Sequence, residues 1–292
     1  MENKILLVLN PIAGDRDKKH IEEAVRYMAI KNNFGLQVYR TTGKNDKANI
    51  LSLLDENDFS RIFIAGGDGT IREVADAIKG RDVLIGLFPS GSANGLAVNL
   101  HIPEDLEEQV QMAMGESFLA VDILEVGDHT SLHISDFGVN AALIKNYEES
   151  DIRGKLGYLI QAIPTLTNTK YPFAVTVEAN DETINEDVIL VAIANAKKFG
   201  TGANINPTGK LDDGIFEVLL FKNFDISEIL KTFYGEIAPN SEFVTVIKTK
   251  EANITCEESI PFQVDGEYLG DKKEITARMR PEKLKILCSI SS

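Results

Sequence analysis

The sequence is poor in the residues that build disulfide and zinc sites. It holds only two cysteines, Cys256 and Cys288, and four histidines in 292 residues. The histidines are scattered, and no Cys–His spacing of the kind that binds zinc is present. We expect both cysteines to be reduced thiols, which is typical of a cytoplasmic protein.

Positive charge and long apolar runs are also scarce. Lysine and arginine number 30 against 45 aspartates and glutamates, which gives a formal net charge of −15. Because this charge opposes attraction to polyanions, we expect no nucleic-acid partner. The longest nearly unbroken apolar run, at 188–196, is too short to cross a bilayer. The apolar stretch near the N-terminus predicts a first strand rather than a signal peptide.

The N-terminal part, 1–121, alternates apolar runs with helix-like segments. The runs lie at 4–10, 36–41, 61–66 and 83–89. The segment at 18–32 has one apolar helical face, formed by Ile21, Ala24, Val25 and Met28. This alternation predicts a mostly parallel sheet with helices on its faces. Ligands of such sheets bind beyond the carboxyl ends of the strands, where this sequence has NPIAG, GGDGT and PSGSANG.

The pattern changes after Val121. Nine short strand-like runs follow, separated by turn residues, and they predict an antiparallel sandwich or barrel over 122–282. One clear helix is expected at 153–166, and the acidic stretch NDETINED at 180–187 is typical of a hairpin turn. The last apolar run, 283–292, could return to the first domain. The predicted fold is therefore an α/β domain followed by a β-sandwich domain.

The GGDGT stretch, 66–70, lies between a buried-strand pattern and a helical one. Ile71, Val74, Ala75 and Ile78 follow at helical spacing, and Gly80 can end the helix. The exposed amides and the dipole at such a helix start favour a phosphate. The motif does not match the dinucleotide-binding fingerprint GxGxxG, because Arg72 occupies the position of the third glycine. The chain also has no Walker-type phosphate loop. The plain alternative is a tight Asp–Gly turn.

GGDGT followed by Glu73-Val74, with NPIAG upstream at 10–14, resembles the catalytic domain of the diacylglycerol kinase family. That family includes bacterial lipid kinases and sphingosine kinases. Three later stretches resemble further motifs of the family in the same order: PSGSANGLAVNL at 89–100, KLDDG at 210–214 and VDGE at 264–267. Together the motifs span nearly the whole chain.

The resemblance implies an ATP site between the two domains. Residues 1–121, to which 283–292 could return, would bind the nucleotide, and 122–282 would bind the lipid substrate. The residues implied to surround the nucleotide are Asn10, Pro11, Gly14, Thr41, Gly66, Gly67, Asp68, Gly69, Thr70, Ile71, Arg72, Glu73, Ser92, Asn94 and Glu267.

Phosphoryl transfer depends on Mg²⁺ and a base more than on covalent chemistry, so carboxylates should converge near a phosphate loop. We expect Asp68, Asp122 and Asp265 there. The resemblance implies that Asp265 is the general base for the attacking hydroxyl, while Asp68 and Asp122 hold Mg²⁺ and its waters. Asp68 and Asp265 could exchange these roles. Asp122 taken alone fits a strand-end turn equally well.

KLDDG at 210–214 has two compatible interpretations. Asp213-Gly214 is a common hairpin signal before a strand. The resemblance implies instead a structural Mg²⁺ held by Asp213 and the backbone carbonyls of Lys210 and Ile215, and hard oxygen ligands suit that ion. A turn is also a good place to present carbonyls, so both can hold.

Asn94 is followed by Gly95, whereas diacylglycerol kinases usually carry Asn-Asp at this place. SANGLA is closer to the sphingosine and ceramide kinase branch, so the acceptor stays open between a diacylglycerol-like and a sphingoid-like lipid. We expect a cytoplasmic, ATP- and Mg²⁺-dependent lipid kinase that meets its substrate by peripheral contact with a membrane surface. A homodimer stays open.

The helix expected at 153–166 resembles the lipid-facing region of the family, although its apolar residues also fit an ordinary core. Those residues are Leu156, Leu159, Ile160 and Ile163. Four basic residues form either a local lipid-facing patch or solvated surface, namely Arg153, Lys155, Lys197 and Lys198.

Two other functions are open. An NAD kinase shares GGDGT and a sandwich domain, but its Asn–Glu pair occurs beyond Gly80 only as Asn185-Glu186, within the stretch predicted to be a turn. A nucleotide-binding regulator that kept the fold and lost catalysis is the second alternative.

Overall fold

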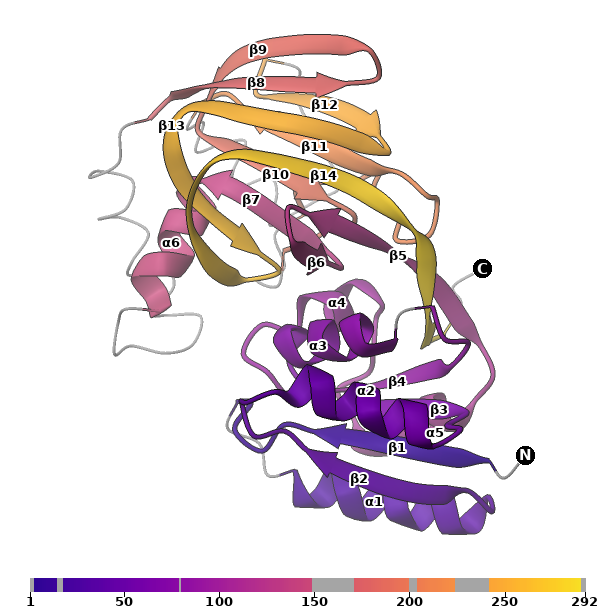
Figure 1. The fold of residues 1–292 in the computed structure, drawn as a ribbon. Coiled ribbons are helices and arrows are strands. Elements are labelled where there is room, and N and C mark those ends of the chain that lie inside the picture. The colour runs from indigo at the N-terminus through magenta and orange to yellow at the C-terminus, as the bar shows by residue number, and fades with distance from the viewer. Residues whose placement is uncertain are drawn as a thin grey trace. The chain divides into compact units, whose positions relative to one another are not determined.

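The structure is a computed structural model that describes residues 3–14, 18–78, 80–148, 171–199, 204–223 and 242–289. The chain forms two compact units, Met1–Val121 with Glu282–Ser292 and Asp122–Pro281 (Figure 1). The helix expected at 153–166 lies outside the described residues, as do Arg153 and Lys155. No helix within the described ranges is both long enough and apolar enough to cross a membrane.

The first unit is built on a parallel sheet. Its strands are β1 (Lys4–Leu9), β2 (Gly35–Arg40), β3 (Arg61–Gly66) and β4 (Leu84–Pro89), in the order β4-β3-β1-β2. The end of β14 (Glu267–Leu287) joins β4 in parallel through Lys285 and Ile286. β1 and β3 are buried on both faces, as expected for a central strand in a parallel sheet.

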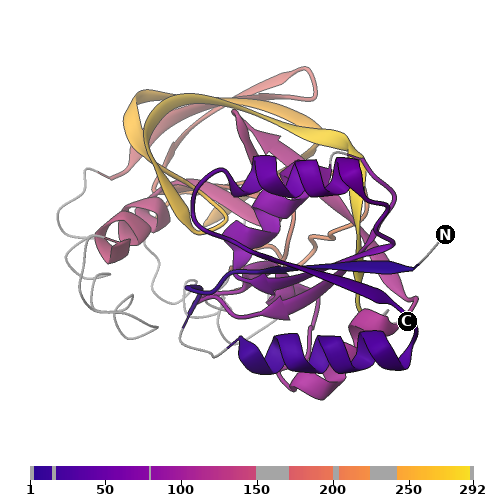
Figure 2. The same cartoon turned by 60° about the horizontal axis from the view of Figure 1, so that its bottom comes forward.

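Helices cover both faces of this sheet, and Figure 2 shows the sheet between them. They are α1 (Lys19–Lys31), α2 (Asp46–Glu56), α3 (Asp68–Ile78), α4 (Gly95–Asn99) and α5 (Leu106–Met114). α1 packs with α5 and α2 packs with α3. Ile21 and Val25 of α1 join Ile5 and Leu7 of β1 in one core, because apolar residues at helical spacing face the sheet.

The second unit is an antiparallel β structure. Its strands are β5 (Phe118–Val126), which starts in the first unit, β6 (His129–Ser131), β7 (Ile134–Gly138), β8 (Phe173–Ala179), β9 (Glu182–Val188), β10 (Leu190–Ala194), β11 (Phe216–Phe221), β12 (Val244–Thr249), β13 (Glu251–Val264) and most of β14. The main sheet has the order β12-β11-β10-β7-β13-β14. β8 pairs with β13 and β9 pairs with β8, while β5 pairs with β14 and β6 pairs with β5. α6 (Val139–Glu148) packs against β7 and β13.

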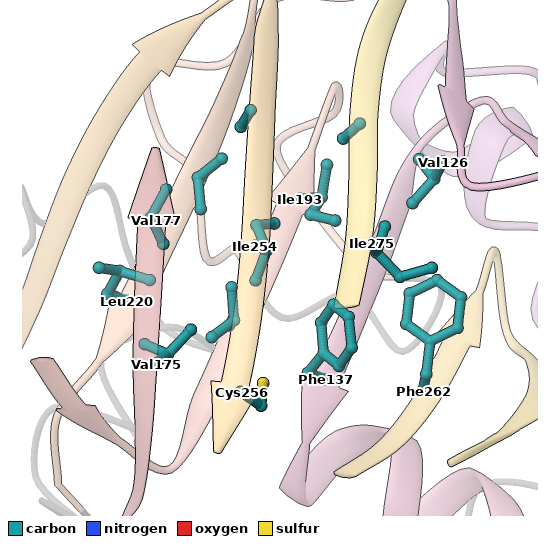
Figure 3. Packing of buried hydrophobic residues seen from close by; sticks show 14 of the residues in the cluster. Val126, Phe137, Val175, Val177, Ile193, Leu220, Ile254, Cys256, Phe262 and Ile275 are labelled. Carbon is teal, nitrogen blue, oxygen red and sulfur yellow. The ribbon is translucent and has the colours of Figure 1, made fainter. Parts of the chain in front are cut away.

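Alternating side chains of these strands form one hydrophobic core (Figure 3). Phe137, Ile193, Leu220, Ile254 and Phe262 are all fully buried in it. β8, β10, β11 and β13 contribute every second residue, which is the period of a strand with one face toward the core. The predicted combination of an α/β domain and an antiparallel β domain is confirmed.

Both cysteines are buried free thiols, and burial raises the pKa of Cys256 to about 11.

The structure corrects the turn expected at 180–187. Only Asn180 and Asp181, both with positive φ, form the turn between β8 and β9. Asn185 and Glu186 lie inside β9 and pair with Thr176 and Val175 of β8. Thr183, Asn185 and Asp187 of β9 are exposed at alternate positions, so the polar density came from an exposed strand face rather than from a loop. Glu186 is half-buried and accepts the Thr245 hydroxyl at 2.9 Å.

β14 also differs from the expectation of two separate runs. The strand continues through Pro281, and its partner changes from β13 before the proline to β4 after it. Proline cannot donate a ladder hydrogen bond, so it is tolerated where one pairing ends and the next begins.

Candidate active site

Three glycine-rich loops follow neighbouring strands of the first unit. NPIAG follows β1, GGDGT follows β3 and PSGSANG follows β4, and these three strands are adjacent and parallel. The Asn10 amide nitrogen donates to the Thr70 hydroxyl at 3.0 Å, and the Asn10 backbone N–H donates to Ala65 at 2.8 Å. Asn10 thereby ties the first loop to the second. The loops meet because the carboxyl ends of parallel strands share one edge of the sheet.

The backbones of these loops touch where glycines stand. A Cβ on Gly91 would lie 2.6 Å from the Cα of Gly67, and a Cβ on Gly14 would lie 2.4 Å from the Ser90 carbonyl oxygen. Gly14 also has φ of +57°, a conformation that side chains disfavour. We call this contact of Gly14, Gly67 and Gly91 with their neighbouring backbone the glycine junction.

Asp68 is bound to the third loop. Its Oδ2 accepts the backbone N–H of Gly95 at 2.7 Å and its Oδ1 accepts that of Leu96 at 3.1 Å. These amides open α4, so Asp68 caps this helix from a distant part of the sequence. Asn94, with φ of +53°, closes its own loop through two hydrogen bonds with Gly91.

The other residues of this unit that are predicted to bind the nucleotide differ in their exposure to solvent. Ile71 is 3% exposed and belongs to the buried core. Arg72 and Glu73 are half-buried in the first turns of α3, whereas Pro11, Gly69 and Ser92 are exposed. Gly66 ends β3, and Thr41 is buried just after β2.

Asp46 was missed by sequence reasoning and shapes the loop after Thr41. Its carboxylate accepts the backbone N–H groups of Thr42 and Gly43 and the Tyr39 hydroxyl, at 2.9, 2.6 and 2.6 Å. Burial alone would raise the pKa of Asp46, but these donors outweigh it and hold the pKa below its usual value. An aspartate directly after a Gly-Lys-Asn turn and before an apolar helix was the available signal.

Asp265 lies in the second unit, in the turn between β13 and β14. It has φ of +49° and its side chain is 2% exposed. The carboxylate accepts the Ser131 hydroxyl at 3.0 Å and the backbone N–H groups of Leu132, His133 and Ile134 at 2.7, 3.1 and 3.2 Å. The His133 Nδ1 lies 3.0 Å from its Oδ1.

Burial by itself would raise the pKa of Asp265. The charge of the adjacent His133 imidazole, together with the amides of Leu132 and His133, outweighs burial and holds the pKa below its usual range. The residues that bind Asp265 were also missed. Ser131, His133 and Ser135 are polar at every second position of a strand pattern, which would have indicated a shared polar face.

The same turn is held from its other side by a buried polar chain. Gly266 donates its backbone N–H to the Gln263 side-chain oxygen at 2.7 Å, and the Gln263 amide nitrogen donates to Asp136. Asn140 donates to the same Asp136 oxygen at 2.6 Å. Burial raises the pKa of Asp136 to about 7 although these amides oppose the shift. Glu267 is exposed at the start of β14.

Asp122 and the KLDDG loop come together in the second unit. Asp122 is fully buried, its backbone N–H donates to Leu211 at 2.7 Å and its Oδ2 accepts the Gly214 N–H at 2.7 Å. Asp213 is exposed, and its side chain accepts the Ile215 N–H at 3.3 Å. The loop therefore folds around Asp122, which is more than a strand-end turn residue. Lys210 is exposed on this loop.

The described residues contain no group of three or more His, Cys, Asp and Glu side chains that could hold a metal ion. Asp68 belongs to the first unit, and Asp122 and Asp265 belong to the second. Their convergence on one phosphate site stays a prediction. Of the expected basic patch, Lys197 is exposed and Lys198 is half-buried.

Comparison with known proteins identifies the family. Residues 4–126 match the diacylglycerol kinase catalytic domain, and residues 134–288 match the YegS C-terminal NAD kinase beta sandwich-like domain. The chain belongs to this family of kinases. The resemblance drawn from the motifs is thereby confirmed.

Relatives align over almost the whole chain. The "Probable lipid kinase YegS" of Escherichia fergusonii is 24% identical over 91% of this chain and 89% of its own length. The "Diacylglycerol kinase" of Staphylococcus carnosus is 25% identical over 92% of this chain and 90% of its own length. The acceptor lipid is not decided by these names, because the two differ in what they specify.

Solved structures agree on the fold. A putative diacylglycerol kinase from Bacillus anthracis superposes with a TM-score of 0.79 at 19% identity, covering 99% of this chain and 98% of its own. An NAD kinase from Archaeoglobus fulgidus in complex with ATP gives 0.56 at 13% identity, covering 97% and 93%. Both likenesses concern the fold alone.

Proposed function

We propose that this chain uses ATP and Mg²⁺ to phosphorylate a hydroxyl of a diacylglycerol-like or sphingoid-like lipid. The glycine junction carries this proposal, because it packs the backbones of three loops together beside the start of α3, where exposed amides favour a phosphate. Membership of the kinase family supports phosphoryl transfer. The ATP named with the NAD kinase of the same fold supports ATP as the donor.

The residues of the first unit would bind and orient the nucleotide. The first amides of α3 lack partners within the helix and, with the helix dipole, attract phosphate oxygens. Asn10 holds Thr70 in the first turn of that helix, so NPIAG and GGDGT act as one rigid cradle. Rigid positioning of this kind supplies a large share of the rate in phosphoryl transfer.

Asp68 fits this cradle as a cap rather than as a base. Both of its oxygens accept amides of α4, which fixes the third loop against the second. Removing it would loosen the loops instead of removing a proton acceptor. We assign the base role to Asp265, as the resemblance of VDGE to the family's motif implies, and a positioning role to Asp68.

The proton acceptor in the proposed reaction is the carboxylate of Asp265. The acceptor's O–H bond breaks and its oxygen forms a bond to the γ-phosphorus, while the bond from that phosphorus to the bridging oxygen breaks and its electron pair leaves on ADP. The proton passes to Asp265. Its 2% exposed side chain keeps bulk water from competing for this proton.

The KLDDG loop offers oxygen ligands, which are the kind that Mg²⁺ prefers. Asp213 and the carbonyls of Lys210 and Ile215 are hard oxygen ligands on a loop that Asp122 anchors through Gly214. These residues would hold a structural ion. An ion bound with the phosphates would neutralise the negative charge that develops on their oxygens during transfer.

A radiolabelled ATP assay tests the proposal. Mixed micelles that contain diacylglycerol, sphingosine or ceramide, and a separate reaction with NAD, are incubated with the protein, ATP and MgCl₂. We expect label in a phospholipid and none in NADP. The Asp265→Asn variant should lose transfer, whereas Asp187→Asn, the same change at an exposed position of β9, should keep it.

The alternatives give different outcomes. Label in NADP alone would overturn the lipid assignment in favour of an NAD kinase. ATP binding in a calorimetric titration without transfer to any acceptor would favour the inactive regulator. Flotation of the protein with lipid vesicles tests the proposed peripheral contact, and no flotation at any vesicle composition would contradict it.

A further inference from the structure

The donors around Asp265 are distributed unequally between its two oxygens. Oδ1 accepts the Ser131 hydroxyl and the backbone N–H groups of His133 and Ile134, and it also lies 3.0 Å from the His133 Nδ1. Among the described residues, Oδ2 accepts a single bond, from the Leu132 N–H at 2.7 Å. A carboxylate oxygen has room for about two acceptor bonds, so Oδ1 is saturated and Oδ2 is not.

His133 is fixed at its backbone as well as at its ring. Its carbonyl oxygen accepts the N–H groups of Asn195 and Ala196 at 2.9 and 3.1 Å, and its imidazole is 5% exposed. The Asn195 side chain also donates to the carbonyl of the preceding Leu132, at 3.3 Å. The imidazole therefore reaches Oδ1 from a backbone that strand β10 holds in place.

His133 is the basic side chain that faces Asp265 within the described part of the chain. The other polar groups near the pair are neutral or more distant. Ser135 of β7 donates to Ser131 at 2.9 Å, Gln263 of β13 holds the adjacent Gly266, and Asp136 of β7 reaches the turn only through Gln263. Glu267 of β14 points to solvent, and the side chain of Asp122 of β5 is bonded to Gly214.

We propose that His133 is a positioning residue for the proton acceptor of the kinase reaction: its imidazole, whose Nδ1 lies 3.0 Å from Oδ1 of Asp265, holds that oxygen in place, so that Oδ2 takes the proton of the acceptor hydroxyl. The proposal rests on the function proposed above. His133 does not gain or lose a proton in the step. Its part is to hold the carboxylate in one orientation, with a proton on Nδ1.

Two substitutions separate this role from packing. His133→Asn keeps an N–H donor one bond beyond Cγ, near the place of Nδ1, whereas His133→Leu has a similar branched shape and no donor. We expect His133→Leu to lower kcat about 10- to 100-fold with KM for ATP within about 2-fold, because only the base is displaced. His133→Asn should recover most of kcat. His129→Leu, on β6 with no contact to Asp265 among the described residues, is the control.

The pH dependence of kcat/KM separates the two roles, because a loss of packing alone would not shift it. The acidic limb of kcat/KM reports ionisation of the base in the free enzyme. His133 contributes to the low pKa of Asp265, so removing it should move the acidic limb of His133→Leu to higher pH. An unchanged kcat and an unchanged limb in a folded His133→Leu enzyme would overturn the proposal.

Nitrogen-15 spectra of the imidazoles test the contact without any assay of activity. The chain has four histidines, so single variants assign His133. We expect a protonated Nδ1 in the native protein and a changed Nδ1 shift in Asp265→Asn. An unprotonated Nδ1 near neutral pH, or a shift unaffected by Asp265→Asn, would overturn the proposal even if His133→Leu fails to fold. A protein with this contact but no lipid kinase activity would contradict the proposed function instead.

Discussion

The carboxylate of Asp68 accepts the backbone N–H of Gly95 at 2.7 Å, which binds the GGDGT loop to the loop after β4. An aspartate among glycines at a helix start invites assignment as a metal ligand or a base. Here its geometry is that of a cap on another helix. The two glycine motifs therefore form one structural unit, and changes in either should affect both.

Asp68→Asn tests the cap. Asparagine offers one acceptor oxygen in place of two, so one amide of α4 loses its partner. We expect a loss of about 0.5–2 kcal/mol in the free energy of unfolding, as for other lost helix caps, together with weaker ATP binding. Urea unfolding and calorimetric titration measure the two effects. Asp58→Asn, at an exposed loop position, is the control. Full stability and affinity with lost turnover would instead favour Asp68 as the base.

Gly91→Ala tests the glycine junction. The new Cβ would lie 2.6 Å from the Cα of Gly67, and backbone has to move to relieve that contact. We expect lower stability and at least about 10-fold weaker ATP binding, since misplaced loops lose several phosphate contacts at once.

Gly69→Ala is the matched variant, because a Cβ at Gly69 meets no atom within 4 Å. We expect its melting temperature to match that of the native protein. A drop in ATP affinity without a drop in stability would indicate that phosphate occupies the space beside Gly69. Equal stability of Gly91→Ala and Gly69→Ala would contradict the junction.

Asp265→Asn should nearly abolish turnover, by about 10²- to 10⁴-fold, while ATP affinity stays within a few-fold. It should also change stability. The pKa of Asp265 is lower in the folded protein than in the unfolded chain, so its ionised form stabilises the fold above the unfolded pKa, and this contribution disappears as the pH falls through the folded pKa. Removing the carboxylate should flatten the loss of stability in acid. Thermal melts at a series of acidic pH values check this, and a native-like acid profile in the variant would contradict it.

Asp136→Asn should have the opposite pH signature. The pKa of Asp136 is raised to about 7 in the folded protein from 3.8, so the folded state binds the proton more tightly. The native protein should therefore lose stability as the pH rises from about 4 to about 7 and change little above that range. Asparagine mimics the protonated acid, so the advantage of the variant should grow over this interval. Urea unfolding at several pH values measures it, with Asp187→Asn as the exposed control.

If the stability of Asp136→Asn and that of the native protein change with pH in the same way, burial does not raise the pKa of the Asp136 carboxyl.

The sequence predicted where the first unit gathers its motifs, and the reason is general. Apolar runs of strand length separated by amphipathic helices imply parallel strands, and parallel strands bring their following loops to one edge. Asn10 and Thr70, 60 residues apart, could be placed together on that basis. The role of Asp68 could not, because a cap contributed by a distant residue leaves no local pattern.

The structure of the second unit was harder to predict from the sequence. Asp265 lies more than 130 residues from the amides that bind it, and the pairing of β7 with β13 that creates this contact is non-local. The turn predicted at 180–187 is wrong over β9 because polar side chains, Thr183, Asn185 and Asp187, face solvent there on alternate residues. Strands exposed on one face carry a weak signal, since the exposed side chains are free to be any polar residue.

The passage of β14 through Pro281 sets an order for folding. The sheet of the first unit takes its final strand segment, 282–287, from beyond the whole second unit, so the ribosome has completed the second unit before that segment exists. Until then β4 is an edge strand with unpaired backbone groups, the kind of edge that recruits other chains. The sheet of the N-terminal unit is therefore incomplete until 282–287 are synthesised, and a chain that stops at Pro281 would carry an open sheet edge.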